Sequence, residues 1–449
     1  METKIPETKG NNLLKAILKS KWYPGIFQIP VVIIFAFITY ELFFGPVSAH
    51  ENFGTALTWV LWWPLIPLIF LLMGRFWCAI CPFATVSDFV QKIVGNNRPV
   101  PQFLKKYGIW IIDAFFIMIT WGDHVYGIVE SPRGSGFMML IIALGAITAG
   151  AFFERRAWCR NLCFLGGVAG NYSRTGALEL RGTPEKCSKC TVAACYKGGE
   201  KAPGCPMFEF PKTMDNSARC NLCGYCVKNC PNDSITISVR PPSRELWFIK
   251  KPKFEESVLA TVIMGIVFVQ NITMLEIWTK AQSFLENILG TQEYAITFTV
   301  IFLIAMAIPV SLLYISSWVA GKSNGESAHL NFARFGYALI PLDLSAHLAH
   351  NLFHLLAEGK SILFTGMSVI GMNVSEQSTA LVSVGTIQML QYALLVIGAL
   401  GSIYTAYRIA KSQYSSEKVI GSALPFTILI IVLTVANIYF FMLPMMHRM

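Results

Sequence analysis

Long apolar stretches recur along the chain and restrict its fold more than any other feature. They approach the ~20 residues that a helix needs to cross the hydrocarbon core of a bilayer. The 449-residue chain is 54% hydrophobic and only 14% charged, which excludes an ordinary soluble globular protein. We therefore expect an all-α polytopic membrane protein with nine spans. The predicted spans are residues 24–44, 55–73, 107–122, 136–153, 256–276, 294–318, 334–357, 383–407 and 420–445.

The basic residues of the loops predict how these spans are oriented. Loops on the N-terminal side of the membrane carry most of the Lys and Arg, whereas the opposite loops carry few. Because cytoplasmic loops hold the excess of positive charge, we expect the N-terminus inside and the C-terminus outside a prokaryotic cytoplasmic (inner) membrane. The formal charge of +10 lies in loops and not on one basic face, which argues against nucleic acid as a partner.

Eight of the twelve cysteines form two runs between Cys187 and Cys230, and each run ends in Cys-Pro. The second run has the C-x2-C-x2-C-x3-C-P spacing of bacterial ferredoxins, in which the fourth thiolate ligates the neighbouring cluster. We expect a small α+β ferredoxin-like insert at residues 181–245, between membrane domains at 1–180 and 246–449, on the cytoplasmic side. The predicted ligands are Cys187, Cys190, Cys195 and Cys230 for one [4Fe-4S] cluster and Cys205, Cys220, Cys223 and Cys226 for the other.

The other four cysteines form two pairs, Cys78 with Cys81 after the second span and Cys159 with Cys163 after the fourth. An Arg and a Trp precede each pair, so the pairs look like halves of a duplicated arrangement at the inner membrane surface, with these residues as interfacial anchors. Four thiols in a reducing compartment favour a third centre of iron, iron-sulfur or zinc. A redox-active dithiol or disulfide, or inert structural thiols, are the alternatives.

These cysteine motifs resemble those of a membrane-bound polyferredoxin family that includes NapH, the membrane part of NosR and CcoG. The resemblance covers about residues 24–245 and implies membrane electron transfer through [4Fe-4S] clusters, with the family's paired-cysteine motifs falling on the four membrane-face cysteines. This chain departs from the pattern, since its first pair is spaced by two residues instead of three and Phe164 follows its second pair instead of Pro. The five C-terminal spans lie outside the resemblance.

Three histidines and an aspartate lie on the seventh predicted span. Asp343, His347, His350 and His354 are spaced to share one stripe of a helix. Ionisable groups inside a span are costly and point to function. The stripe is interpreted as ligands of haem b or another metal, as a quinone site with Asp343 relaying protons, or as histidines satisfied by hydrogen bonds between packed helices.

These features predict a transmembrane electron conduit, either an electron-transfer subunit or a membrane oxidoreductase of a respiratory or other redox system. Its cytoplasmic clusters exchange electrons with a haem, metal or quinone site toward the outer half of the membrane. The expected partners are a cytoplasmic ferredoxin or flavodoxin, the quinone pool, and an extracytoplasmic redox enzyme. Basic residues near the clusters suit an acidic carrier, and equally a solvated surface that sets orientation. They are Lys186, Lys189, Lys197, Lys201 and Arg219.

Two other functions fit the same residues. The resemblance to CcoG implies a metal reductase or assembly factor that acts on copper or iron. A redox-sensing membrane protein, whose clusters switch a partner, is the non-catalytic alternative. Haem in the protein would favour the conduit, whereas copper at the membrane-face cysteines would favour assembly.

Overall fold

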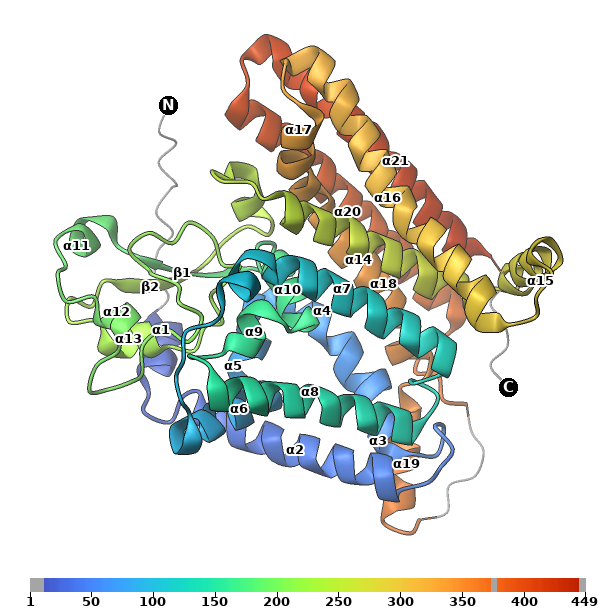
Figure 1. The fold of residues 1–449 in the computed structure, drawn as a ribbon, viewed down its shortest axis with the longest axis horizontal. Coiled ribbons are helices and arrows are strands. Elements are labelled where there is room, and N and C mark those ends of the chain that lie inside the picture. Colours follow the sequence, from blue (N-terminus) through green and yellow to red (C-terminus); the bar gives the residue numbers. More distant parts are fainter. Residues whose placement is uncertain (1–11, 373–377, 444–449) are drawn as a thin grey trace. The chain divides into compact units, whose positions relative to one another are not determined.

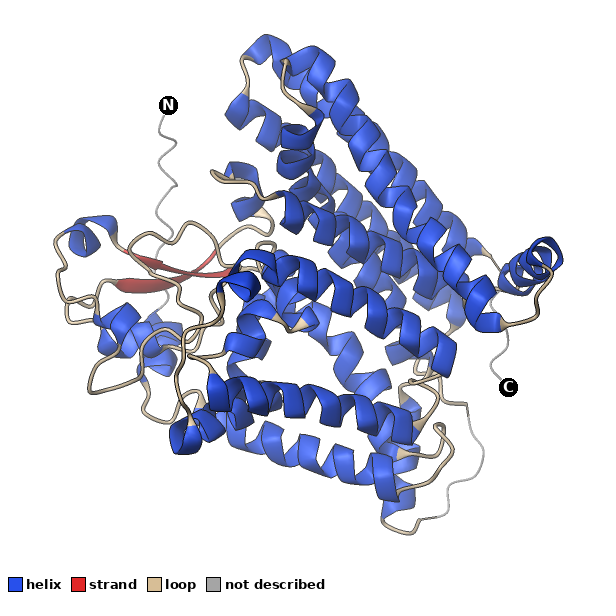
Figure 2. Cartoon of the chain, viewed as in Figure 1, coloured by secondary structure: helices blue, strands red, loops and turns tan. Residues whose placement is uncertain are grey.

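Helices dominate the computed structural model, which describes residues 12–372 and 378–443 (Figures 1 and 2). Within these residues, seven helical segments are long and apolar enough to cross a membrane. The chain is therefore a multi-pass membrane protein. The segments are Gly25–Phe44 (α2), Phe53–Val94 (α3 to α6), Pro132–Phe152 (α8), Phe254–Ile272 (α14), Tyr294–Asn324 (α16), Val384–Gln413 (α20) and Ser416–Met442 (α21).

The predicted count of nine spans is not confirmed, because the third and seventh predicted spans are not among the seven. Both segments are largely helical. The third lies within α7 (Gln102–Tyr126), whose apolar run is interrupted by Asp113 and flanked by Lys105, Lys106 and Asp123. The seventh is broken into α17 (Ala328–Phe335), a 3-10 turn (Gly336–Leu339) and α18 (Ile340–Ala357). The last two residues of the ninth predicted span, 444 and 445, lie outside the described residues.

Two compact units can be distinguished by their internal packing. The first contains the chain up to Ala36, Ile69–Gly108 and Ile141–Glu245. The second contains Phe37–Leu68, Ile109–Leu140 and the chain from Leu246 onward. The three-part division expected from the sequence stays a prediction.

A two-stranded antiparallel sheet organises the ferredoxin-like segment of the first unit. Strand β1 (Leu178–Gly182) pairs with β2 (Ile235–Val239), with Leu180 opposite Ile237. The short helices that carry or adjoin the cysteines are α11 (Pro184–Ser188), α12 (Ala194–Lys197) and α13 (Tyr225–Asn229). Leu180 and Ile237 are buried in a small core with residues from α13 and from the turn before it. The sheet thus joins the two ends of the segment.

The N-terminal helix α1 (Asn12–Lys19) completes that small core. Leu18 is buried in it, and the hydroxyl of Tyr23 donates a hydrogen bond of 2.5 Å to the carbonyl of Leu222. Lys15 and Lys19 form ion pairs of 3.1 and 2.7 Å with Asp233. In Figure 1, α1 accordingly lies beside α13. About 200 residues of chain separate α1 from the segment it packs on, so the contact is tertiary and not local.

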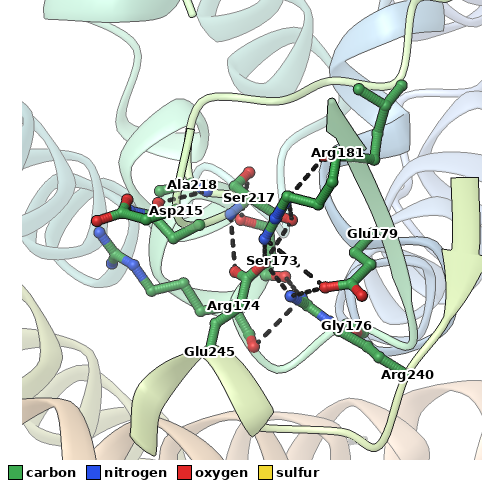
Figure 3. Close-up of polar contacts among 12 residues, drawn as sticks. Ser173, Arg174, Gly176, Glu179, Arg181, Asp215, Ser217, Ala218, Arg240 and Glu245 are labelled. Carbon is green, nitrogen blue, oxygen red and sulfur yellow. Dashed lines mark hydrogen bonds and ion pairs between the residues drawn. The ribbon is translucent and has the colours of Figure 1, made fainter. Parts of the chain in front are cut away.

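A buried network of arginines and glutamates fixes the base of the sheet (Figure 3). The Arg240 side chain is fully buried and donates 2.8 and 2.9 Å hydrogen bonds to the carbonyls of Gly176 and Ser173. Arg240 and Arg181 both form ion pairs with Glu245. Glu245 also accepts a 2.7 Å bond from the backbone N–H of Ser217. The network therefore anchors the chain directly before Cys220.

The second unit is built mainly from long helices. In it, α18 packs against α14 and α20, α20 packs against α21, and α16 packs against α14 and α21. Figure 1 shows α16 and α21 side by side along much of their length. Phe335 and Phe426 stack with ring centroids 4.1 Å apart inside this core. The packing buries most of α18, including Asp343, His347 and His350.

Candidate functional sites

The first cysteine site is a pocket in the ferredoxin-like segment. Cys187, Cys190, Cys195 and Cys230 surround about 350 Å³ of space that no atom fills. Cys187 comes from α11, Cys195 from α12, and Cys230 follows α13. The pocket therefore combines three cysteines of the first run with the last cysteine of the second, which is the set expected for one cluster from the ferredoxin spacing.

The second cysteine site is a similar pocket of about 360 Å³. Its cysteines are Cys205, Cys220, Cys223 and Cys226. Here Cys205, the last cysteine of the first run, joins three cysteines of the second run. The exchange of one cysteine between the runs is thus reciprocal, and the two pockets fit two cubane clusters. Their assignment as cluster ligands stays a prediction.

In both pockets, cysteine sulfur atoms have hydrogen-bond partners, as cluster ligands do. The Oγ of Ser234 lies 2.8 Å from the Sγ of Cys187, and the backbone N–H of Ser234 donates 3.2 Å to the Sγ of Cys230. The backbone N–H of Glu209 donates 3.3 Å to the Sγ of Cys205. Such bonds stabilise thiolate ligands and tune the potential of a bound cluster.

Burial and hydrogen bonding give the thiols different acidities. Burial raises the pKa of the Cys220 and Cys223 thiols to about 12. Backbone N–H groups of Ala193 and Val192 lower the pKa of Cys190, which is only half-buried. Cluster binding needs thiolates, so the buried thiols must release protons when a cluster forms.

The four membrane-face cysteines form a third group in the first unit, and their local structures are duplicates. Cys78 lies in the short helix α5 (Trp77–Ile80), and Cys81 is the N-cap of α6 (Pro82–Val94). Cys159 lies in the short helix α9 (Ala157–Asn161), and Cys163 is the N-cap of α10 (Phe164–Tyr172). The thiol of Cys159 interacts electrostatically with the other three. The structure thus brings both pairs together at helix N-termini, which favour anions.

Two buried arginines hold the duplicated halves together. Arg75 and Arg156 are 4% and 3% exposed, and each stands three residues before the first cysteine of its own pair. Arg75 Nη2 donates 3.3 Å to the carbonyl of Cys159, and Arg156 Nη1 donates to the carbonyl of Cys78. The donors therefore cross between the halves. The sequence predicted these arginines as interfacial anchors. Their shared position, three residues before each pair, indicates hydrogen bonds between the halves only once the fold brings the two pairs together.

The charge of Arg75 tests whether an anionic cluster fits this third group. Arg156 pairs with Asp88 at 2.7 Å, whereas Arg75 donates to the Sγ of Cys78 at 3.4 Å and to two carbonyls. No carboxylate of the described ranges forms an ion pair with Arg75. A buried charge needs a counter-charge. A cluster held by four thiolates carries negative charge and supplies it, so the residues present fit this group.

No group of three His, Cys, Asp or Glu side chains in residues 12–372 and 378–443 is arranged to hold a single metal ion. His347, His350 and His354 are accordingly not gathered around one ion. The zinc and the iron-sulfur interpretations of the membrane-face cysteines both stay predictions.

The histidine helix α18 in the second unit gives each polar side chain a different neighbour. The ring of His347 lies 6.1 Å from that of Trp63, and Nδ1 of His350 lies 2.8 Å from Oδ1 of Asn271. His354 is less buried and approaches Glu358 at 3.7 Å. Asp343 is fully buried, and among the described residues its carboxylate has no hydrogen-bond partner. The predicted stripe exists, but its members do not converge on one point.

Comparison with known proteins identifies iron-sulfur segments in the same places. Two family models, both described as a 4Fe-4S binding domain, match the chain. One matches residues 55–101 and 135–178, which contain the membrane-face cysteines. The other matches residues 214–236, which contain the second ferredoxin-like run.

A relative from Escherichia coli (strain K12), YccM, bears a name that describes an electron transport protein. It is 25% identical over 229 residues, which cover 45% of this chain and 60% of YccM. No solved structure matches the chain. Together with the membrane helices, these findings support iron-sulfur electron transfer in a membrane protein. They do not confirm the specific likeness to NapH, NosR or CcoG.

Proposed function

We propose that the chain is a transmembrane electron conduit with three [4Fe-4S] clusters. The observation that carries this proposal is the reciprocal exchange of Cys205 and Cys230 between the two cysteine pockets. Two full sets of four thiols, each around space that no atom fills, suit two clusters close together, as in bacterial ferredoxins. When bound, the clusters supply one-electron chemistry, and the protein sets their potentials through burial and hydrogen bonds.

The third cluster is held by Cys78, Cys81, Cys159 and Cys163. Arg75 supports this assignment because it connects the group to the second cluster's segment. Its Nη1 donates 2.5 Å to the carbonyl of Ala218, two residues before Cys220. One buried guanidinium thus contacts the surroundings of two cysteine groups. Electrons can pass between centres that share such a contact without crossing solvent.

Electrons enter or leave on the cytoplasmic side through the first cluster. The loop charges favour this orientation. Cys190 is only half-buried, and the basic residues predicted to steer an acidic carrier are all exposed. A ferredoxin or flavodoxin is the expected partner. The exposed basic residues are Lys186, Lys189, Lys197, Lys201 and Arg219.

We assign the histidine helix to the other end of the electron path, toward the outer half of the membrane. The expected redox partner of the clusters there is a haem, another metal or a quinone. The buried Asp343 of this helix is placed as a proton relay, since a carboxylate without a hydrogen-bond partner inside a helical core is costly to keep charged. An extracytoplasmic redox enzyme or the quinone pool completes the system.

Metal analysis of the anaerobically purified protein tests the proposal. We expect about twelve irons and twelve sulfides per chain, four of each per cluster, with EPR signals from interacting clusters after reduction. Serine substitution of all four membrane-face cysteines should lower the iron to about eight while the signals of the ferredoxin-like segment persist. An unchanged iron content in that variant would refute the third cluster, and a wild-type protein without iron would refute the whole proposal.

A further inference from the structure

Two five-residue turns of the ferredoxin-like segment have the same backbone structure, and each begins with a Cys-Pro pair. The turns are residues 205–209 and 230–234. The fourth residue of each has a positive φ, 54° at Phe208 and 47° at Asp233. The backbone N–H of the fifth residue donates to the Sγ of the first, over 3.3 Å from Glu209 and 3.2 Å from Ser234. The two cysteine pockets thus share this backbone contact but receive different side chains at the fifth position.

In the first pocket, the side chain at this position is a hydroxyl that points at sulfur. Ser234 is 2% exposed, and its Oγ lies 2.8 Å from the Sγ of Cys187. The backbone N–H and the Oγ1 of Thr183 each donate a 2.9 Å bond to the carbonyl of Ser234 and hold it in place. A cysteine that ligates a cluster carries no proton, so the Ser234 hydroxyl must be the donor. Such a bond favours the more negative, reduced cluster and raises its potential.

In the second pocket, the side chain at this position is an acid. Glu209 lines the pocket, and its carboxylate acts on the thiols of Cys205 and Cys220. Burial raises the pKa of both thiols, and the charge of this carboxylate acts in the same direction. The cation near Cys220 is Arg181, which is already paired with Glu245. A carboxylate beside a cluster opposes an added electron and lowers the potential of the cluster.

The charged residues that line the two pockets differ in the same sense. Among the described residues, Lys212 is the charged side chain that lines the first pocket, and Glu209 is the one that lines the second. A nearby ammonium group stabilises the reduced state of a cluster, whereas a carboxylate destabilises it. The side-chain hydrogen bond and the local charge therefore both favour reduction of the first cluster.

We propose that Ser234 and Glu209 set the potential of the first cluster above that of the second, so that the first electron taken up by the pair resides on the first cluster. The ordering rests on the proposed function, since both pockets must hold clusters. One electron leaves the reduced second cluster and enters the oxidised first cluster, with no bond formed and no proton moved. Electrons that reach the second cluster from the membrane-face centre therefore collect on the first.

An EPR-monitored redox titration of the full-length protein at pH 8 tests this ordering. Ser234→Ala removes the hydroxyl but keeps the backbone bond to Cys230. Loss of one hydrogen bond should make reduction of the first cluster about tenfold less favourable, which is about 59 mV for one electron. Glu209→Gln removes the charge at similar volume and should make the second cluster easier to reduce. The first variant should therefore lower the higher of the two reduction steps, and the second should raise the lower step.

The matched control is Ser238→Ala. Ser238 is a buried serine of the same segment, 4% exposed, whose Oγ bonds to Glu179 at 3.4 Å, and it lines neither pocket. Both steps should keep their wild-type potentials in this variant. A general loosening of the segment would shift them here as well.

Iron content is measured on every sample, so that loss of a cluster is recognised separately from a change in its potential. A wild-type protein without iron would remove the proposed function and this ordering together. Wild-type potentials in both Ser234→Ala and Glu209→Gln at full iron content would overturn the ordering alone, as would a Ser234→Ala shift confined to the lower step. If Ser234→Ala loses its cluster, the Glu209→Gln titration decides, because an unchanged separation of the two steps there also contradicts the inference.

Discussion

Replacement of Arg75 is the sharpest test of a cluster at the membrane-face cysteines. Arg75→Gln removes a 4%-exposed positive charge whose Nε lies 3.4 Å from the Sγ of Cys78. At an effective dielectric constant of about 20 and about 5 Å, a unit charge and an added electron interact by about 3 kcal/mol. Charge spread over the cluster reduces this, so we expect a one-electron potential lower by on the order of 100 mV.

The sign follows from the charge that is lost. Reduction adds negative charge to a cluster that is already anionic, and the guanidinium stabilises the reduced form more than the oxidised one. Its removal therefore makes the third cluster harder to reduce. The assay is an EPR-monitored redox titration of the purified protein, with iron content measured on the same sample to show that the cluster is still present.

Two further variants sharpen the result. Arg75→Lys keeps the charge but loses the forked hydrogen bonds, so its shift should be smaller. Arg98→Gln removes an exposed arginine of the same unit and should leave the potential unchanged, because water screens surface charges. An Arg75→Gln potential equal to that of Arg98→Gln, at full iron content, would refute the electrostatic account of this site.

Three other results are expected. In the cluster-free protein at pH 8, iodoacetamide should alkylate Cys190 well before Cys220, because hydrogen bonds lower the pKa of Cys190 whereas burial raises the pKa of Cys220 to about 12. Peptide mass spectrometry measures the two rates, and equal rates would contradict this expectation. Changing exposed Lys186 and Lys189 to Glu should slow reduction by an acidic ferredoxin in stopped-flow assays and remove most of its salt dependence, unless the carrier docks elsewhere. Glu245→Gln should destabilise the ferredoxin-like segment by about 3 kcal/mol, because it leaves buried arginines without their partner, and faster loss of cluster absorbance on heating measures this.

The grouping of the cysteines in the ferredoxin-like segment could be predicted because it depends on the short spacing between neighbouring cysteines. A run such as Cys220 to Cys230 fixes which thiols can reach one cluster and which must reach the next. The exchange of Cys205 for Cys230 followed from that rule alone. The two strands were less evident, although the alternating residues Ile235–Val239 do form one of them.

Contacts between segments that are distant in the sequence could not be predicted from the sequence. Arg75 and Cys159 are 84 residues apart, and only the folded unit reveals that their groups meet. Helical periodicity placed His347 and His350 on one stripe, yet the partner of His350, Asn271, is 79 residues away. The count of nine spans is not confirmed for a related reason, since hydropathy does not show where a helix such as α18 begins.

The docking of α1 on the ferredoxin-like segment has a practical consequence for work with isolated fragments. Leu18 and Tyr23 fill part of the core around Leu222 and Ile235, so the segment is discontinuous in sequence. A fragment confined to residues 181–245 would expose that apolar surface to water and also lack Leu178 at the start of β1. A soluble fragment of this protein designed to carry the clusters therefore needs residues 12–23 fused to it, so that they cover this apolar surface.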